Sequence, residues 1–367
     1  MITDRERQIL GWIRENPSIT QKELAEKARI SRSSVAVHVS NLTRKGAILG
    51  RRYILQESPY IAVVGAACID VIGWPERDAD GTEQLEGTVR SVASGSARSV
   101  AQFLAHLDRQ VRLVSVFGDD ANAERLMDGC RRDGVDISDS LVSRGLETAS
   151  NVYMTRPNGT RRLVLRDAKA FELLTADYLA THLDVIDRAA VCVVDSSVPP
   201  ESRSFLWQNV HAPLFFAPSA TDRRQPLEDD LQRPELVKLD VRLLGEVLDR
   251  ELRDRASIRT AADELLSRGP LALFIPLDEG GMYCASQSER AFLPWAGGPI
   301  PQSNEFSDAM TAGIAWGWVQ DLGVRRSAQA GLVAASACAN ARGATRVSLN
   351  DRSMRMRLGM SVREPGE

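Results

Sequence analysis

No run of about 18 consecutive apolar residues occurs in this sequence, which excludes a membrane-spanning helix. The first seven residues are charged and lack the apolar core of a secretion signal. The five cysteines are an odd number and form no Cys-x-x-Cys pair, which argues against a disulfide framework and against a zinc site. Histidine is scarce, at four residues, so no metal site is predicted. We therefore expect a cytoplasmic protein.

Charged residues are unevenly distributed along the sequence. The chain has 367 residues, 43% of them hydrophobic and 26% charged, which is long enough for two globular domains. Residues 1–57, the head, hold 11 basic and 6 acidic residues, whereas residues 58–367, the body, hold 35 and 43. A small basic head on an acidic body predicts that the head binds an anionic partner.

The head carries the start signals of three short helices. Thr3 and Thr20 are each followed three residues later by glutamate, which is the pattern of a capping box. Ser31 begins the third helix, whose apolar residues recur at helical spacing. Residues 47–55 read as a basic hairpin. Three helices and a hairpin are typical of a winged helix-turn-helix domain, which the head resembles.

In such domains the third helix enters the major groove of DNA and the hairpin contacts phosphate or the minor groove. We therefore predict that double-stranded DNA is a partner. The alternative is a helical protein-docking module with a solvated basic face. The residues expected to contact DNA are Arg32, Ser33, Ser34, His38, Arg44, Arg51 and Arg52.

The body alternates apolar strands with helical patterns. Residues 60–65 form a nearly continuous apolar run, as expected of a buried parallel strand, and similar runs recur between amphipathic stretches. This alternation predicts an α/β fold with a parallel sheet. Residues 79–92 and 150–166 are richer in threonine, valine and glycine, and we expect them to build a small lid sheet beside the main one.

Several motifs of the body, in the right order, resemble the ribokinase-like (PfkB) family of sugar and nucleoside kinases. They are residues 65–73, residues 94–105, the Gly118-Asp119-Asp120 turn, Thr148 and the Ser307-Asp308 pair. Within the family, residues 94–105 are most similar to the substrate motif of pseudouridine kinases. The resemblance implies a three-layer α/β/α domain with a small β lid over residues 58–367, and some pseudouridine kinases carry a helix-turn-helix, as here.

The resemblance also implies a reaction. In these kinases an aspartate takes the proton from the substrate hydroxyl, backbone N–H groups stabilise the transferring phosphoryl group, and Mg²⁺ neutralises the triphosphate. Asp308 matches the base, and Asp70 matches the aspartate that binds sugar hydroxyls. The positions expected to contact a ligand are Asp70, Gly95, Ser99, Asp167 and Asp308.

The phosphate-binding positions depart from the family pattern. Residues 301–313 read as a loop that turns into a helix, and Glu305, Phe306 and Ser307 stand where the family has Gly-Ala-Gly. Glycine lets backbone N–H groups approach phosphate, whereas Glu305 adds negative charge and Phe306 adds bulk. The nucleotide-site positions that we interpret as degenerate are Asp240, Asp278, Glu305, Phe306 and Ser307.

Two hypotheses follow. The first is a dimeric DNA-binding transcription regulator whose body senses a nucleoside- or sugar-type ligand and has lost kinase activity, a pseudokinase. The alternative is an active kinase of a nucleoside such as pseudouridine, or of a sugar, with a regulatory DNA-binding head. ATP and Mg²⁺ are expected only in the second case.

Overall fold

The computed structural model describes residues 2–17, 19–48, 59–78, 84–218, 227, 229–297, 304–339 and 349–361. The chain divides into two compact units, Met1–Pro59 and Tyr60–Glu367, and each is described here by itself. Among the described residues, no helix is both long enough and apolar enough to cross a membrane.

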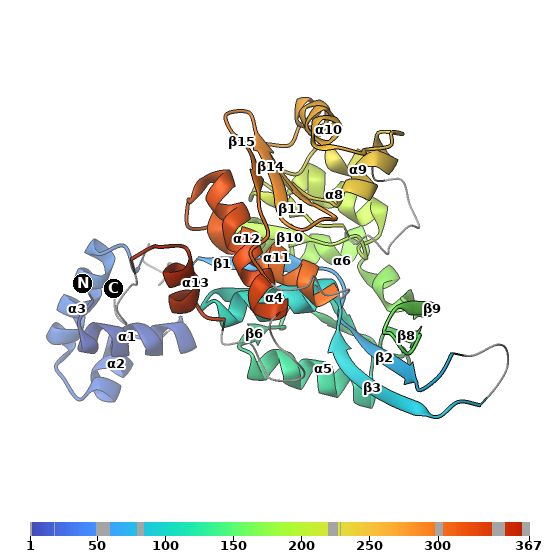
Figure 1. The fold of residues 1–367 in the computed structure, drawn as a ribbon. Helices are drawn as coiled ribbons and strands as arrows, with labels where there is room; N and C mark the ends of the chain where they lie inside the picture. The colour runs from blue at the N-terminus through green and yellow to red at the C-terminus, as the bar shows by residue number, and fades with distance from the viewer. Residues whose placement is uncertain are drawn as a thin grey trace. The chain divides into compact units, whose positions relative to one another are not determined.

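The described residues of the first unit form the helices α1 to α3 (Figure 1), and both predicted capping boxes are confirmed. Ser31 accepts a hydrogen bond from the backbone N–H of Ser34 at the start of the third helix. Buried Ile9, Ile13, Leu24, Val35, Leu42 and Ile48 form the small core. The predicted hairpin of residues 47–55 lies outside the described residues beyond Ile48. The helices are α1 (Asp4–Glu15), α2 (Gln21–Ala28) and α3 (Arg32–Arg44).

The second unit is organised around a nine-stranded sheet with the order β15-β14-β13-β12-β11-β10-β1-β4-β6. Its strands from β6 to β13 are parallel, as the apolar runs predicted. The antiparallel edge strands β14 and β15 were not predicted. The strands are β1 (Tyr60–Val64), β4 (Gln110–Val114), β6 (Val135–Asp136), β10 (Val191–Val194), β11 (Leu214–Phe216), β12 (Leu236–Lys238), β13 (Ala272–Pro276), β14 (Met282–Ser286) and β15 (Arg290–Leu293).

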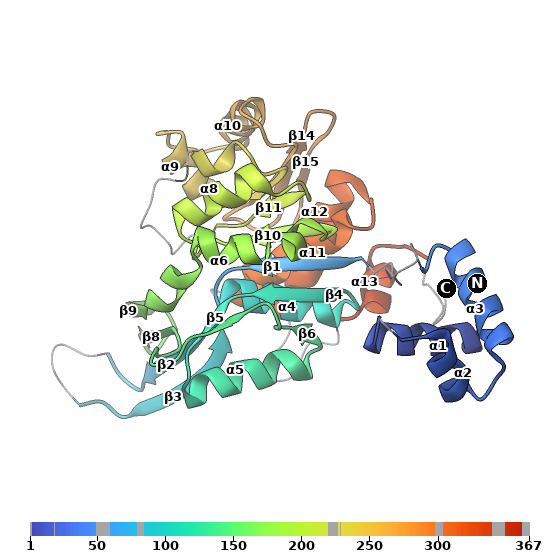
Figure 2. The same ribbon diagram turned by 180° about the vertical axis from the view of Figure 1, so that it is seen from behind.

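Helices cover both faces of this sheet, with one hydrophobic core on each side (Figures 1 and 2). The helices packed into one core are α4 (Ser96–His106), α5 (Ala121–Arg132), α11 (Asn304–Trp318), α12 (Gly323–Ala339) and α13 (Asp351–Arg357). Those in the other are α6 (Ala176–Thr181), α7 (Leu183–Asp187), α8 (Pro200–Asn209), α9 (Val241–Val247) and α10 (Arg255–Ser267), with the short helices η1 (Lys169–Leu173) and η2 (Asp229–Leu231) beside them. The architecture is the three-layer α/β/α arrangement.

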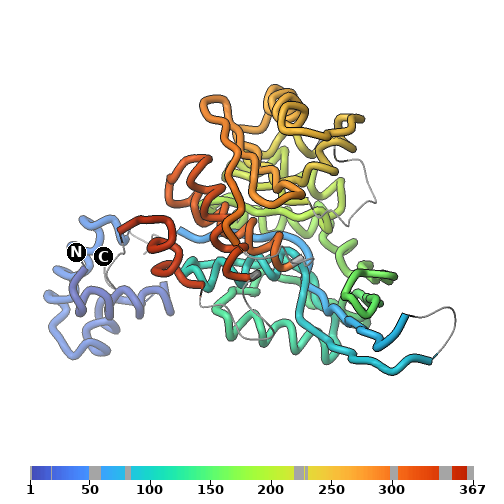
Figure 3. Tube along the Cα trace, in the orientation of Figure 1, coloured from blue at the N-terminus to red at the C-terminus, as the bar shows by residue number. Residues whose placement is uncertain are grey.

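A second sheet of four strands projects from the body, in the order β3-β2-β8-β9. Figure 3 shows its two halves, which are far apart in sequence, running side by side. This sheet is the predicted lid, although residues 79–83 lie outside the described residues. Its strands are β2 (Cys68–Pro75), β3 (Gly87–Ser94), β8 (Ser150–Thr155) and β9 (Arg161–Asp167); a separate pair is β5 (Val116–Phe117) and β7 (Leu141–Val142).

Candidate ligand site

The loop after β1 and the start of α4 approach each other closely at Gly95. This glycine has φ 104°, and a Cβ there would lie 2.4 Å from the carbonyl oxygen of Ala66. Only glycine satisfies both conditions without strain. Ser99, one turn into α4, is buried, and its backbone N–H donates to the Gly95 carbonyl at 2.8 Å. Gly95 thus fixes the N-terminus of α4 against the end of β1.

A carboxylate that the sequence analysis did not identify, Asp195, holds this junction together. It follows β10 and is buried. Its Oδ2 accepts backbone N–H groups of Ala66 at 2.9 Å and of Ala97 at 3.1 Å. A Cβ on Gly65 would lie 2.3 Å from the Asp195 carboxylate. The sequence does hold a signal for Asp195, because it follows the apolar run 189–194 directly. Residues at the carboxyl ends of parallel strands commonly line a ligand site.

The lid contributes a second buried carboxylate, Asp70, on β2. Its oxygens accept hydrogen bonds from Ser94 Oγ and from Asn151 Nδ2, each at 2.8 Å. Asn151, on β8, lies opposite Asp70 of β2 on one side and opposite Arg166 of β9 on the other. Burial, and then the charge of Asp70, raise the pKa of the neighbouring Cys68 thiol. Asp70 is therefore held in one orientation by three strands of the lid.

Asp308 lies four residues after Asn304, where α11 begins, and is buried. Burial raises its pKa well above the usual value, an effect that nearby Lys238 opposes and that the charge of Asp195 reinforces. Ser96, at the start of α4, acts to lower the pKa of Asp308. Gly95, Ser96, Asp195 and Asp308 thus meet where two helix N-termini face the ends of the strands.

Lys238 is the second residue that the sequence analysis did not identify. It ends β12, is buried, and its Nζ donates to Ser307 Oγ at 2.8 Å. Burial lowers the pKa of Lys238, and the charges of Asp308 and Asp240 act in the opposite direction. A cation of the chain itself therefore lies at the start of α11.

The expectation that Glu305, Phe306 and Ser307 belong to a loop is wrong. Helix α11 begins at Asn304, so these residues form its first turn. The physical reason is composition, because three residues with side chains replace two glycines and an alanine, and glycine is a poor helix former.

Phe306 packs its ring against neighbouring apolar side chains. Its ring lies edge-on to Trp295, with centroids 5.2 Å apart, and contacts the core. Trp295 borders a pocket of about 370 Å³ between the end of β15 and helices α12 and α13. Most of its lining is apolar, and Arg357 is its charged member.

The remaining predicted positions are placed as follows. Asp240 caps α9 by accepting the Leu243 N–H at 2.7 Å, and Leu243 itself is buried. Asp278 is exposed in the turn between β13 and β14. Asp167 is exposed at the end of β9 and accepts the Lys169 N–H at 3.3 Å, so the structure does not bring it to the Asp70 cluster. Within the described residues, no group of three or more His, Cys, Asp or Glu could hold a metal ion.

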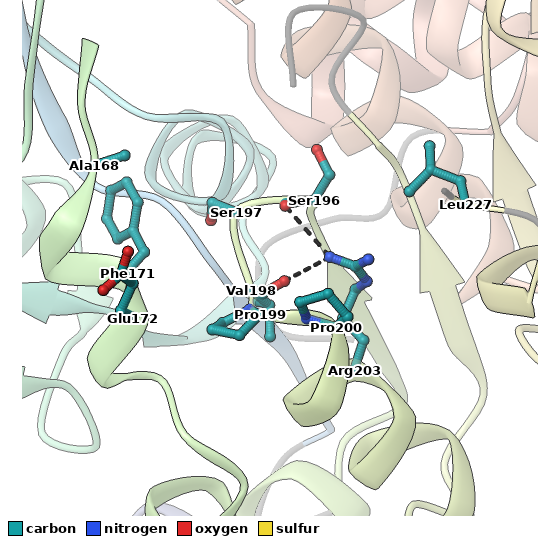
Figure 4. A pocket seen from close by; sticks show the side chains of 10 residues that line it. All are labelled: Ala168, Phe171, Glu172, Ser196, Ser197, Val198, Pro199, Pro200, Arg203 and Leu227. Atoms are coloured by element: carbon teal, nitrogen blue, oxygen red, sulfur yellow. Dashed lines mark hydrogen bonds between the residues drawn. The ribbon is translucent and has the colours of Figure 1, made fainter. Parts of the chain in front are cut away.

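A small cavity of about 100 Å³ lies beside the loop that follows β10 (Figure 4). Buried Arg203 fixes this loop, because its Nη1 donates to the carbonyl oxygens of Val198 at 2.6 Å and Ser196 at 3.4 Å. Its Nε donates to Asp230 at 2.9 Å, so the guanidinium charge is already neutralised. We interpret Arg203 as a support for the Asp195 loop.

In the first unit, three of the five described residues predicted to contact DNA lie away from the core. Arg32, Ser33 and Arg44 are exposed, and Ser34 and His38 are half-buried. Arg51 and Arg52 lie outside the described residues.

Comparison with known proteins matches each unit to a protein family. Residues 58–351 match the pfkB family of carbohydrate kinases, and residues 2–48 match a winged helix-turn-helix DNA-binding family. The chain is 30% identical to the uncharacterized sugar kinase YeiI of Escherichia coli over 89% of this chain and 91% of that protein. It is 26% identical to the pseudouridine kinase of the same organism, over 73% of this chain and 86% of that protein.

Solved structures show the same fold. The structure of Arabidopsis thaliana ribokinase complexed with ribose and ATP superimposes with a TM-score of 0.73, at 17% identity, over 83% of this chain and all of that one. The nucleoside kinase of Methanocaldococcus jannaschii gives 0.68 at 15% identity, over 83% and 99%.

Proposed function

Because this chain belongs to the pfkB family of carbohydrate kinases and carries a winged helix-turn-helix head, we propose that it is a transcription regulator built on a kinase fold. Its body binds a nucleoside- or sugar-type ligand and no longer transfers phosphate. The observation that carries the proposal is the first turn of α11, where Glu305, Phe306 and Ser307 are helical. In the same turn, Lys238 donates a hydrogen bond to the Ser307 hydroxyl.

The residues present fit Mg²⁺–ATP poorly. Phosphate binding by a helix N-terminus relies on unobstructed N–H groups and an absence of nearby negative charge. Glu305 brings a carboxylate to that turn, and buried Leu243 stands where the family has a glutamate that helps to arrange magnesium. Removal of a single preorganised donor lowers the rate roughly 10²–10³-fold, so this combination argues against phosphoryl transfer.

The ligand-binding half is better preserved. Asp70 is buried and oriented by Ser94 and Asn151, which suits the recognition of hydroxyl groups. In this proposal Gly95, at the N-cap of α4, Ser99 on α4 and Asp308 on α11 contact the ligand from the other side. A ligand between the lid and these helix starts alters DNA binding only if its affinity differs between two states of the protein.

The head contacts double-stranded DNA through α3, with Arg32, Ser33, Ser34, His38 and Arg44 on the binding side. Two heads reading paired half-sites call for a dimer. The exposed apolar face of the lid, which includes Val89, Leu163 and Leu165, supports dimerisation through that sheet.

A thermal-shift panel of nucleosides, sugars, sugar phosphates and ATP–Mg²⁺ tests the proposal. A bound ligand raises stability by about 2.7 kcal/mol at roughly 100 times its Kd. We expect a nucleoside or sugar to raise Tm and ATP–Mg²⁺ to leave it unchanged. Asp70→Asn removes the shift, whereas Asp128→Asn, on the exposed side of α5, keeps it. Turnover of ATP with a nucleoside at ordinary kinase rates would overturn the proposal.

The second candidate is an active nucleoside or sugar kinase with an autoregulatory head. The retention of both Asp70 and Asp308 in buried positions favours it. In that case ATP and Mg²⁺ are required and Asp308 is the base. Calorimetric binding of ATP–Mg²⁺, together with loss of turnover in Asp308→Asn, would establish it in place of the regulator.

A further inference from the structure

Helix α3 exposes an apolar side chain on the side that faces away from the core. Val37 is 59% exposed, whereas Val35 and Leu42 are buried. Two residues along a helix rotate the side chain by about 200°, so Val37 points opposite to Val35. Valine is a poor helix former because its χ1 freedom is restricted, and an exposed valine gains no burial in compensation.

The surroundings of Val37 are polar and free of acids. Ser33 and Asn41 lie one turn before and after it, and Arg44 Nη2 donates to Asn41 Oδ1 at 2.6 Å. No Asp or Glu occurs between residues 27 and 56. A surface with positive charge and hydroxyl groups suits the polyanion DNA better than an apolar protein patch, in which charge is depleted.

We propose that Val37 is a specificity-determining residue that contacts the C5-methyl group of a thymine in the major groove. This inference rests on the proposed DNA-binding function. The thymine methyl is the apolar group that the major groove displays, and apolar side chains read it. Val37 lies near the middle of α3, between polar side chains that can bind phosphates and base edges. These contacts hold the helix in the groove, so that the thymine methyl of one base pair per half-site packs against Val37.

The test uses the full chain and a duplex selected from a random library by that chain. Each thymine of the selected site is replaced in turn by deoxyuridine, which removes the methyl and nothing else. At one position per half-site we expect wild-type affinity to fall about fourfold, which corresponds to one buried methyl group at about 0.8 kcal/mol. Val37→Ala should bind the thymine and deoxyuridine duplexes equally, with the same salt dependence as wild type.

Arg44→Ala is the matched comparison on the same helix. It should weaken all duplexes alike, reduce the slope of log affinity against log salt by about one, and keep the preference for thymine. If Val37→Ala keeps the preference for thymine, or if wild type shows none at any position, the inference is wrong and the exposed valine belongs to a protein contact. Failure to select any duplex would instead refute DNA binding itself.

Discussion

Lys238 and Asp308 are a buried cation and a buried acid at the same helix start. Lys238 Nζ donates to Ser307, and its charge opposes the raised pKa of Asp308. We expect Lys238→Met to lower the free energy of unfolding by roughly 1–3 kcal/mol at neutral pH, because the half-buried Ser307 hydroxyl loses its donor. Chemical denaturation of the two proteins measures this loss.

The loss should depend on pH in a defined direction. The pKa of Asp308 is raised in the folded protein, so Asp308 holds its proton to a higher pH than it does in the unfolded chain. The contribution of Asp308 to the free energy of unfolding is fully present below the pKa of the unfolded chain. It is lost as the pH rises through the pKa of the folded protein. Lys238 opposes the raised pKa, so Lys238→Met enlarges the loss at pH 8 relative to pH 5. The double variant Lys238→Met/Asp308→Asn should recover part of it; equal losses at both pH values would contradict this account.

Some residues of the candidate site could be proposed from the sequence because they belong to local motifs. Gly95, Ser99 and Asp308 stand in such motifs at the starts of helices. Asp195 and Lys238 contact residues that are 129 and 69 positions away in the sequence. The sequence around each residue contains no motif that predicts those contacts. Predicting them requires the order of strands in the sheet.

Helices α11 and α12 pack with glycine at their contact. A Cβ on Gly313 would lie 2.5 Å from the carbonyl oxygen of Ala330 on α12, and that atom is backbone. The two helices must separate to admit a methyl group, so we expect Gly313→Ala to lower the free energy of unfolding by about 1–3 kcal/mol. Chemical denaturation of the full chain, followed through the transition of the body, measures it.

Gly129→Ala, inside α5 of the same unit, is the control. There the nearest atom to an added Cβ is 3.5 Å away, an ordinary contact. This variant should be neutral or more stable by up to about 1 kcal/mol, because alanine favours the helix. If the two substitutions change stability alike, helix propensity and not packing decides the effect at Gly313.

At the level of elements, the alternation of strand and helix was predictable and the edge hairpin was not. Strand β14 reverses direction after Gly280 and Gly281, both with positive φ, and β15 reverses again after residues 287–289. The segment between β13 and α11 contains no helix among its described residues to signal a parallel crossover. Helix α11 begins earlier than the family loop predicts, because residues 305–307 form a helix where the family has glycines.

For the whole molecule, the decisive surface is the apolar face of the lid. The register places Leu165 opposite Val152, and Leu163 opposite Met154, so these side chains share one face of the sheet. Leu165 is 68% exposed, and contiguous exposed apolar surface of this kind marks an interface. We expect the full chain to elute with about twice its 40.3 kDa mass, and Leu165→Lys to elute as a folded monomer, as measured by light scattering.

The matched control is Leu271→Lys, which places the same charge on a leucine that is 52% exposed, directly before β13 and away from the lid. It should leave the dimer intact. Because a protein that reads two half-sites loses affinity when its heads are separated, Leu165→Lys should also bind a selected duplex more weakly while keeping its base preference. A wild-type chain that is monomeric at micromolar concentration, or a Leu165→Lys variant that remains dimeric, would exclude the lid as the interface and leave each head to bind DNA alone.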